Sequence, residues 1–445
     1  MSKALVIGLA KSGVASIQIL LKKGYRVRAA DIKEERSFPG LRKEFADVEF
    51  FFGPHEEDCL SGADLLVISP GVPSDLPLIV KARQQKIKVI SEVELAYEHY
   101  SRHWVCVTGT DGKSTTTSLI GAILKQAGVP VIVAGNIGEP LTEEILKAGE
   151  GTYVVAELSS FQLENIVQLR PEIGILVNIA RDHLDRYKDM EEYIRAKFNL
   201  FRNQQESDHS VFNSGNALSM EWLKRIPVSS DTYFFSLARE NSRGAFFKEG
   251  AFWWKEDGKE ERVLPDGIQK IQGIHNKENI LAAITAAKIL KIKNKKIERA
   301  VRDFKGLPHR MEFVRELKGR SFYNDSKATT TSAVKMSIAG FSNVILLMGG
   351  RDKGLDYSEL NETLNRNVKY LILIGEAKEK IRSMIRYDQE RIYLIDDFKK
   401  AVEKSYEISR PGDHIILSPA CTSYDMFRNF EERGERFRKE VLALS

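Results

Sequence analysis

The stretch VCVTGTDGKSTTT, residues 105–117, decides the fold of the chain around it. An apolar, β-branched run leads into Gly109 and Gly112, and an apolar helical pattern follows. In a phosphate-binding loop of this kind, glycine N–H groups and a helix N-terminus attract an anion. Lys113 adds a positive charge, and Ser114 offers a hydroxyl to Mg²⁺. We therefore expect the loop to hold a nucleotide triphosphate.

The loop is shorter than the common Walker A loop, which would place a glycine at Val107. The alternative interpretation is an ordinary glycine turn that begins a helix, with Lys113 solvated. We favour the nucleotide loop because the strand and the helix stand where the motif requires them.

At 445 residues, the chain exceeds what one hydrophobic core usually organises. Changes of pattern near residues 91–103 and 305–308 predict three domains, 1–92, 93–305 and 306–445. Strands alternate with helices in most of the chain, so we expect an α/β protein with mostly parallel sheets.

The composition is that of an ordinary soluble protein, with 42% apolar and 29% charged residues. No apolar run approaches the roughly 20 residues that cross a bilayer, and no signal-peptide layout is present, so we expect a cytoplasmic location. Three widely spaced cysteines argue against disulfides or a cysteine metal site. The net charge of +5 is only mildly basic, which favours anionic small-molecule substrates over nucleic acid.

Near the N-terminus, residues 4–16 predict a strand, a glycine turn and a helix, and residues 27–31 a second strand that ends in an acid. This resembles a dinucleotide fingerprint, but Ala10 replaces the middle glycine, so a nicotinamide cofactor does not follow. A phosphate-holding turn and a purely structural turn both stay open. Ser69 follows a further strand, at the edge where open α/β sheets bind ligands.

Two strands of the middle part end in polar residues. The strand YVVAE delivers Glu157 to its end, where a phosphate loop needs a carboxylate for Mg²⁺; the alternative is an acid that caps a helix. The strand GILVN ends in Asn178 and leads to Asp182, His183 and Asp185. A lone histidine is usually structural, but one between two acids at a strand end favours a functional site.

Further along, residues 208–254 predict short alternating strands. Residues 273–290 predict a long amphipathic helix with Asn276 and Asn279 on its first turn; capping explains one asparagine more readily than both. After about residue 305 the strand and helix rhythm predicts a parallel sheet covered on both faces. Three of its strands end in polar residues: Asn324, Asp325 and Lys327; Lys353; and Ser418 and Ser423.

Eight motifs together resemble the Mur ligase family. In chain order they are TGTDGKSTTT, AELSSFQLE, NIARDHLDRY, GIHNKEN, LPHRMEF, NDSKATT, GGRDKG and SPACTSYDMFRNFEERGERF. The short phosphate loop and HNKEN are shared with the wider family, which includes folylpolyglutamate synthase. GLAKSG, LPHRME and the last motif are similar to the members that add D-glutamate, and no counterpart is present of the arginine-bearing motif of the diaminopimelate-adding members.

The resemblance implies an ATP-dependent amide ligase. It would add D-glutamate to UDP-N-acetylmuramoyl-L-alanine through an acyl phosphate, in peptidoglycan precursor synthesis. It implies a Rossmann-like N-terminal domain for the UDP end of the substrate, a central ATP-binding domain and a Rossmann-like C-terminal domain for the amino acid. ATP, two magnesium ions and a monomeric state are implied as well.

The resemblance also implies roles for single residues. Those implied for ATP are Gly109, Thr110, Asp111, Gly112, Lys113, Ser114, Thr115, Asn279, Arg310 and Asp325. Those for the UDP substrate are Lys11, Ser12, Ser69, Asn136, Ser159 and His183, and those for the amino acid are Lys327, Thr329, Lys353, Ser423 and Phe430. Those for magnesium are Ser114, Glu157, His183 and Lys197, and the catalytic set is Lys113, His183 and Lys197.

Two of these positions need comment. Lys197 matches the lysine that the family carbamylates to bridge its magnesium ions; without the resemblance, a lysine on a predicted helix is a solvated charge. Asp111 stands where the family usually has asparagine, and phosphate repels an acid there unless the acid faces Mg²⁺ or a lysine.

Two other functions stay open. One is a ligase of the same family that adds a different amino acid or acts on folate. The other is a nucleotide-binding switch that uses ATP without joining substrates. An oxidoreductase is disfavoured by Ala10.

Overall fold

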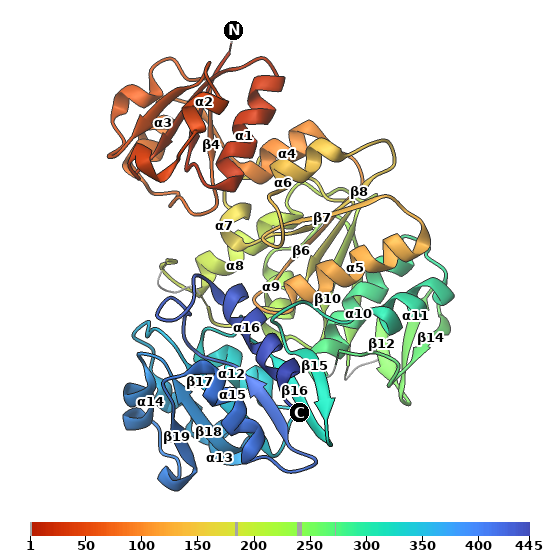
Figure 1. Ribbon diagram of the computed structural model, residues 1–445. Helices are drawn as coiled ribbons and strands as arrows, with labels where there is room; N and C mark the ends of the chain where they lie inside the picture. The colour runs from red at the N-terminus through yellow and green to blue at the C-terminus, as the bar shows by residue number, and fades with distance from the viewer. Residues whose placement is uncertain (1, 183–185, 238–242, 272) are drawn as a thin grey trace. The chain divides into compact units, whose positions relative to one another are not determined.

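The computed structural model describes residues 2–182, 186–237, 243–271 and 273–445 (Figure 1). The chain forms two compact units, Met1–Phe304 and Lys305–Ser445. The first unit contains two sheets and the second contains one. Within the described residues, no helix is long and apolar enough to cross a membrane.

The first sheet has five parallel strands in the order β3-β2-β1-β4-β5. They are β1 (Lys3–Ile7), β2 (Arg26–Asp31), β3 (Glu49–Phe52), β4 (Leu65–Ile68) and β5 (Lys88–Ser91), with helices α1 (Lys11–Lys22), α2 (Leu41–Glu44) and α3 (Pro77–Gln84). The apolar runs of β1 and β4 are buried almost throughout, as expected for central strands of a covered parallel sheet.

The second sheet has nine strands in the order β14-β13-β12-β11-β10-β9-β6-β8-β7. They are β6 (Trp104–Thr108), β7 (Val131–Gly135), β8 (Tyr153–Glu157), β9 (Ile173–Leu176), β10 (His209–Asn213), β11 (Asp231–Ser236), β12 (Gly244–Lys248), β13 (Ala251–Glu256) and β14 (Lys259–Pro265). All pairs are parallel except β12 with β13 and β13 with β14.

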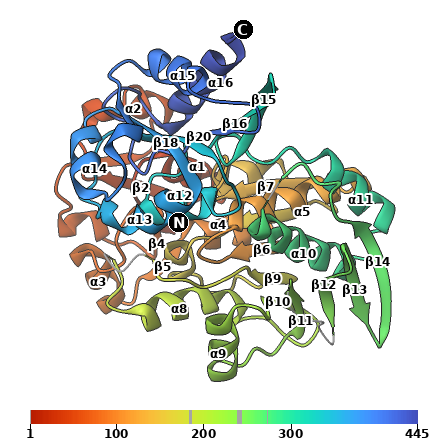
Figure 2. The same ribbon diagram turned by 90° about the horizontal axis from the view of Figure 1, so that it is seen from below.

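Helices surround this sheet, and α5 packs against α10 and α11 (Figure 2). The helices of this part are α4 (Glu92–His99), α5 (Lys113–Ala127), α6 (Leu141–Glu144), α7 (Ser160–Leu163), α8 (Met190–Phe198), α9 (Ala217–Arg225), α10 (Ile274–Ile289) and α11 (Asn294–Asp303).

Short strands prevail in the stretch 208–254, as predicted, but the sequence did not indicate α9, which forms between β10 and β11 with the Asn216 side chain as its cap and Trp222 buried. One prediction about this part is wrong. Helix α10 is not amphipathic in its setting, since every residue from Ile280 to Ala287 is buried. Its continuous small and apolar run suits a helix enclosed on several sides.

The second unit contains a six-stranded sheet in the order β15-β16-β20-β17-β18-β19. Its strands are β15 (Glu312–Leu317), β16 (Arg320–Asn324), β17 (Val344–Gly349), β18 (Val368–Ile374), β19 (Ile392–Leu394) and β20 (His414–Leu417). Only β15 is antiparallel to its neighbour, and the sequence did not indicate this edge strand. The helices are α12 (Thr331–Ile338), α13 (Asn361–Asn367), α14 (Lys378–Met384), α15 (Phe398–Glu407) and α16 (Phe430–Ala443). The predicted α/β class with mostly parallel sheets is confirmed.

Candidate functional site

The glycine loop joins β6 to α5, as the sequence predicts. Gly112 precedes the helix in the left-handed region, with φ of 78°, and a Cβ atom there would lie 2.2 Å from Oδ1 of Asn279 on α10. At Gly109, φ is 149° and a Cβ would lie 3.2 Å from the backbone of Asn178. The positive φ favours glycine at both positions, and at Gly112 a side chain would also force Asn279 to move.

The loop is held in shape by its neighbours. Oδ1 of Asn178 accepts the N–H groups of Thr110, at 3.1 Å, and of Asp111, at 2.8 Å. Nζ of Lys113 donates to the carbonyls of Gly109, at 2.9 Å, and Thr110, at 2.7 Å. These two bonds hold the lysine ammonium against the backbone of the loop.

Glu157 lies at the end of β8 and is buried. Its Oε1 accepts the side-chain amide of Asn136 at 2.9 Å, while Oε2 is buried without a hydrogen-bond partner among the described residues. Ser159, not Glu157, caps the following helix α7, so helix capping does not explain the acid. An unpaired carboxylate oxygen with the buried Ser114 as a second oxygen ligand fits the donor set that Mg²⁺ prefers.

The described residues contain no group of three acidic, histidine or cysteine side chains placed to hold a metal. His183, which the resemblance implies for magnesium, and Asp185, an acid of the same predicted cluster, lie outside the described residues. Asp182 is exposed.

Lys197 is not a solvated charge, because it lies in α8 with only 1% of its surface exposed. Its Nζ donates to the carbonyl of Gly109 at 2.7 Å and lies 4.4 Å from the ring centre of Tyr193. Burial, joined by the charge of Lys113, holds the pKa of Lys197 well below its usual range. The nearby acids, among them Glu157, oppose this shift only in part.

Asn276 and Asn279 do not cap α10, since the residue before the helix is Gly273 and no side chain caps it. Nδ2 of Asn279 donates to Oδ1 of Asn276 at 3.2 Å, and Oδ1 of Asn279 accepts the hydroxyl of Thr116 at 3.3 Å. The helix is therefore attached to the first turn of α5 beside the phosphate loop.

The turn after β1 is closed by the protein's own groups. Ser69 donates its hydroxyl to the carbonyl of Gly8 at 2.8 Å, and a Cβ on Gly13 would lie 1.8 Å from that same oxygen. Lys11 is exposed at the start of α1 and pairs with Glu139 at 2.9 Å. Ser12 is half-buried beside it.

Ser159 belongs to a capping box with Gln162 at the start of α7. Its hydroxyl accepts the N–H of Gln162 at 3.3 Å, while Oε1 of Gln162 accepts the N–H of Ser159 at 2.9 Å. The structure thus gives Ser159 a local role in addition to the predicted contact with substrate.

In the second unit, the predicted amino-acid residues come from loops that follow β16, β17 and β20, except Phe430, which is the first residue of α16. Nζ of Lys327 lies 5.3 Å from the ring centre of Phe430, and Nζ of Lys353 lies 3.5 Å from the Thr329 hydroxyl. Ser423 is buried and its carbonyl accepts the N–H groups of residues 426 and 427. Parallel strands bring these loops to one edge of the sheet.

Asp325 is buried and already bound within the protein. Oδ1 accepts the N–H of Met311 at 3.1 Å, and Oδ2 accepts the hydroxyls of Ser418, at 3.0 Å, and Ser337. Burial raises the pKa of Asp325 to about 6. The predicted nucleotide residues fall in both units, because Asn279 belongs to the first and Arg310 and Asp325 to the second.

Two residues of the site were not assigned from the sequence. Asn178 shapes the phosphate loop, and its position at a strand end was the available signal. Arg433 of α16 is fully buried and donates to the carbonyls of Ser326, Cys421 and Thr422, so it joins the loops that carry Lys327 and Ser423. A lone arginine in a charged helix gives no comparable signal in the sequence.

Three family models match the chain. They are described as Mur ligase MurD-like, N-terminal domain (residues 2–91), Mur ligase middle domain (residues 107–287) and Mur ligase, glutamate ligase domain (residues 309–421). A similar protein is the UDP-N-acetylmuramoylalanine--D-glutamate ligase of Geobacter metallireducens. It is 41% identical over 444 residues, which cover 99% of this chain and 97% of the relative.

Solved structures share the fold. The UDP-N-acetylmuramate-alanine ligase MurC of Thermotoga maritima has a TM-score of 0.61 at 19% identity, with 100% of both chains covered. The MurF ligase of Thermotoga maritima, solved in complex with ADP, has a TM-score of 0.60 at 18% identity, with 94% of this chain and 95% of that chain covered.

Proposed function

Because the chain belongs to the Mur ligase family, we propose that it joins D-glutamate to UDP-N-acetylmuramoyl-L-alanine with ATP as the source of energy. The observation that carries this proposal is the phosphate loop. The loop combines Lys113 with two glycines whose positive φ disfavours any other residue. Beside β6 in the sheet, strand β8 ends at Glu157, whose buried Oε2 has no hydrogen-bond partner among the described residues. The reaction is an ADP-forming ligation of an acid with an amino acid.

The chemistry follows from the weakness of a carboxylate as an electrophile. The L-alanyl carboxylate attacks the γ-phosphorus of ATP, the bond to the ADP oxygen breaks, and an acyl phosphate forms. The amine of D-glutamate then adds to the acyl carbon, and phosphate leaves as the amide forms. A base must take the proton of the ammonium group; His183 is one candidate, and it lies outside the described residues.

Lys113 is proposed to hold the transferred phosphoryl group. Its Nζ now donates to two carbonyls of the loop, so the ammonium is already oriented when ATP arrives. Gly109 to Thr115 would surround the phosphates, and Asn279, Arg310 and Asp325 would contact adenosine and phosphates. Asp111 donates its backbone N–H to Asn178, which fixes its backbone within the loop.

Magnesium would be held by Ser114 and Glu157, His183 would serve a second ion, and a carbamylated Lys197 would serve both. When bound, the ions neutralise the phosphate oxygens. We propose that Lys197 is carbamylated, because a buried lysine with a lowered pKa is in part the neutral amine that reacts with CO₂. Activity should then fall in CO₂-depleted buffer and return with bicarbonate; equal rates in both buffers would refute the carbamate.

The remaining assignments are also proposals. Lys11, Ser12, Ser69, Asn136 and Ser159 would bind the UDP substrate. Lys327, Thr329, Lys353, Ser423 and Phe430 would bind D-glutamate. We propose domain limits at 92/93 and 305/306, a monomer, and a cytoplasmic location.

The decisive experiment measures phosphate release with each component omitted in turn. The proposal requires turnover that depends on ATP, UDP-N-acetylmuramoyl-L-alanine and D-glutamate together, and its loss in Lys113→Ala. Other amino acids and folate serve as competing substrates. Nucleotide binding without any amino-acid-dependent turnover would favour a switch and overturn the ligase.

A further inference from the structure

The loop from Leu307 to Glu312 has an unusual backbone. His309 has φ of 62° and Met311 has φ of 43°, so two residues with side chains occupy the left-handed region on either side of Arg310. Apart from glycine, few residues adopt this conformation; asparagine, aspartate and histidine do so more often than others, and for a residue such as Met311 it costs energy. Such a backbone persists only where surrounding contacts hold it.

His309 is held on two sides. Its Nδ1 accepts the side-chain amide of Asn324 at 2.9 Å, so the neutral ring carries its proton on Nε2. The ring also packs on α16 at Gly434, where a Cβ atom would lie 2.1 Å from the same Nδ1. His309 is 6% exposed. A side chain at position 434 would collide with its ring.

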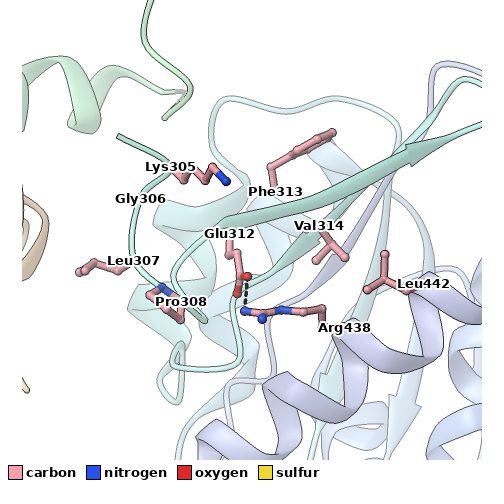
Figure 3. Close-up of a pocket in the computed structure, with 9 residues that line it drawn as sticks. All are labelled: Lys305, Gly306, Leu307, Pro308, Glu312, Phe313, Val314, Arg438 and Leu442. Carbon is pink, nitrogen blue, oxygen red and sulfur yellow. Dashed lines mark hydrogen bonds and ion pairs between the residues drawn. The ribbon is translucent and has the colours of Figure 1, made fainter. Parts of the chain in front are cut away.

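Glu312 completes the arrangement at the start of β15. Its Oε2 accepts the backbone N–H of His309, at 2.9 Å, and the amide of Asn324, at 3.1 Å. Its Oε1 pairs with Arg438 of α16. Figure 3 shows this pair in the wall of a pocket of about 470 Å³ whose rim includes Lys305 and Phe313.

These contacts determine the position of Arg310 in the loop. Both of its neighbours are held, because His309 is bound to Asn324 and Glu312, and Met311 donates its N–H to the buried Asp325 at 3.1 Å. Nε of Arg310 is buried and has no hydrogen-bond partner in the part of the chain that the structure describes. The carbonyl of His309 also accepts the N–H of Lys327 at 3.1 Å, which links the loop to a proposed D-glutamate residue.

We propose that His309 and Asn324 are positioning residues that hold the strained loop so that Arg310 is presented to the phosphates of ATP. The inference rests on the proposed function, in which Arg310 contacts the nucleotide. His309 touches no substrate in this scheme and acts only through its neighbour. The link to Lys327 means that the same loop also supports the proposed amino-acid site.

A double-mutant cycle tests this. Binding of a non-hydrolysable ATP analogue is measured by calorimetry for the full chain, for His309→Ala, for Arg310→Ala and for the double variant. We expect each single variant to bind about tenfold more weakly, because a misplaced or missing charged donor loses a strong contact. In the Arg310→Ala background, His309→Ala should change binding less than about twofold.

Three further variants separate positioning from general damage. His309→Asn should restore binding, because asparagine tolerates the left-handed region and offers an acceptor oxygen near Nδ1. Asn324→Ala, which leaves residue 309 intact, should show the same loss and the same non-additivity. The matched control is Asn343→Ala, an exposed residue with φ of 54° in the same unit, which should bind like the parent.

The outcomes are distinct. Additive losses, or a His309→Ala protein that binds like the parent, would overturn the inference, as would unchanged binding in Arg310→Ala. Thermal unfolding of each variant shows whether it is folded. If His309→Ala does not fold, the binding and non-additivity of Asn324→Ala test the positioning role instead. The ligase proposal is judged separately, by phosphate release from the unaltered protein.

Discussion

Gly112→Ala provides a sharp test of the phosphate loop, because the same helix offers a matched control. Gly112 precedes α5 and Gly128 follows it, and both lie in the left-handed region, with φ of 78° and 83°. Alanine costs about 1 kcal/mol or more at either site for backbone reasons alone. In a unit of this size, that lowers the melting temperature by roughly 2–4 °C per kcal/mol.

Only Gly112 carries a second penalty. A Cβ there would lie 2.2 Å from Oδ1 of Asn279, whereas nothing lies within 4 Å of a Cβ on Gly128. Asn279 cannot retreat freely, since it is bound to Thr116 and Asn276. The loop must therefore move by about 1 Å, and a misplacement of that size costs roughly 100-fold in rate, or about 2.7 kcal/mol.

The assay is phosphate release at varied ATP, with saturating UDP-N-acetylmuramoyl-L-alanine and D-glutamate. We expect Gly112→Ala to lose about 100-fold in kcat/KM for ATP and Gly128→Ala to stay within about twofold, although both melt a few degrees lower. If the two variants have the same kcat/KM for ATP, the close packing of the loop on α10 does not position the nucleotide.

Three other predictions concern acids of the first unit. Burial raises the pKa of Glu92 from 4.5 to about 7. Between these two pH values the folded state keeps a proton that the unfolded state releases, so the free energy of unfolding should fall by up to about 3 kcal/mol as the pH rises. Glu92→Gln should remove that slope in urea unfolding at pH 5 and pH 8, and an unchanged slope would contradict the assignment. Glu94 is buried and accepts three backbone N–H groups, of residues 167, 168 and 169, so Glu94→Ala should lower the melting temperature by at least about 6 °C; a loss under a degree would contradict this. Glu139→Gln should release Lys11 from its ion pair and modestly lower the KM for the UDP substrate, whereas Glu144→Gln on the same segment should not; equal KM values would show that Lys11 does not meet the diphosphate.

Much of the fold could be read from local patterns. The β6, glycine loop and α5 sequence is contiguous, and hydrophobic periodicity with glycine punctuation is enough to predict it. The central strands of each sheet are short apolar runs, which a covered parallel sheet requires. Helix α9 was missed because its signal is a single capping asparagine and one buried tryptophan.

The setting of a side chain could not be read in this way. Lys197 has the local sequence of a solvated helix residue, yet α8 buries it against Gly109, far away in sequence. Helix α10 was expected to be amphipathic, and it is enclosed because α5, α11 and the sheet pack on it. His309 and Asn324 are ordinary polar residues in the chain, and only their contact explains the strained loop.

The sequence alone determined the order of most strands and helices, the phosphate loop and the residues available for chemistry, because these depend on neighbours within a few positions. Tertiary structure alone decided the surroundings of each group. It leaves Oε2 of Glu157 buried without a hydrogen-bond partner among the described residues and lowers the pKa of Lys197. It also holds the two residues with positive φ on either side of Arg310. Burial and contacts between distant segments determine the desolvation and the hydrogen bonds of each side chain, and neither is defined until the chain has folded.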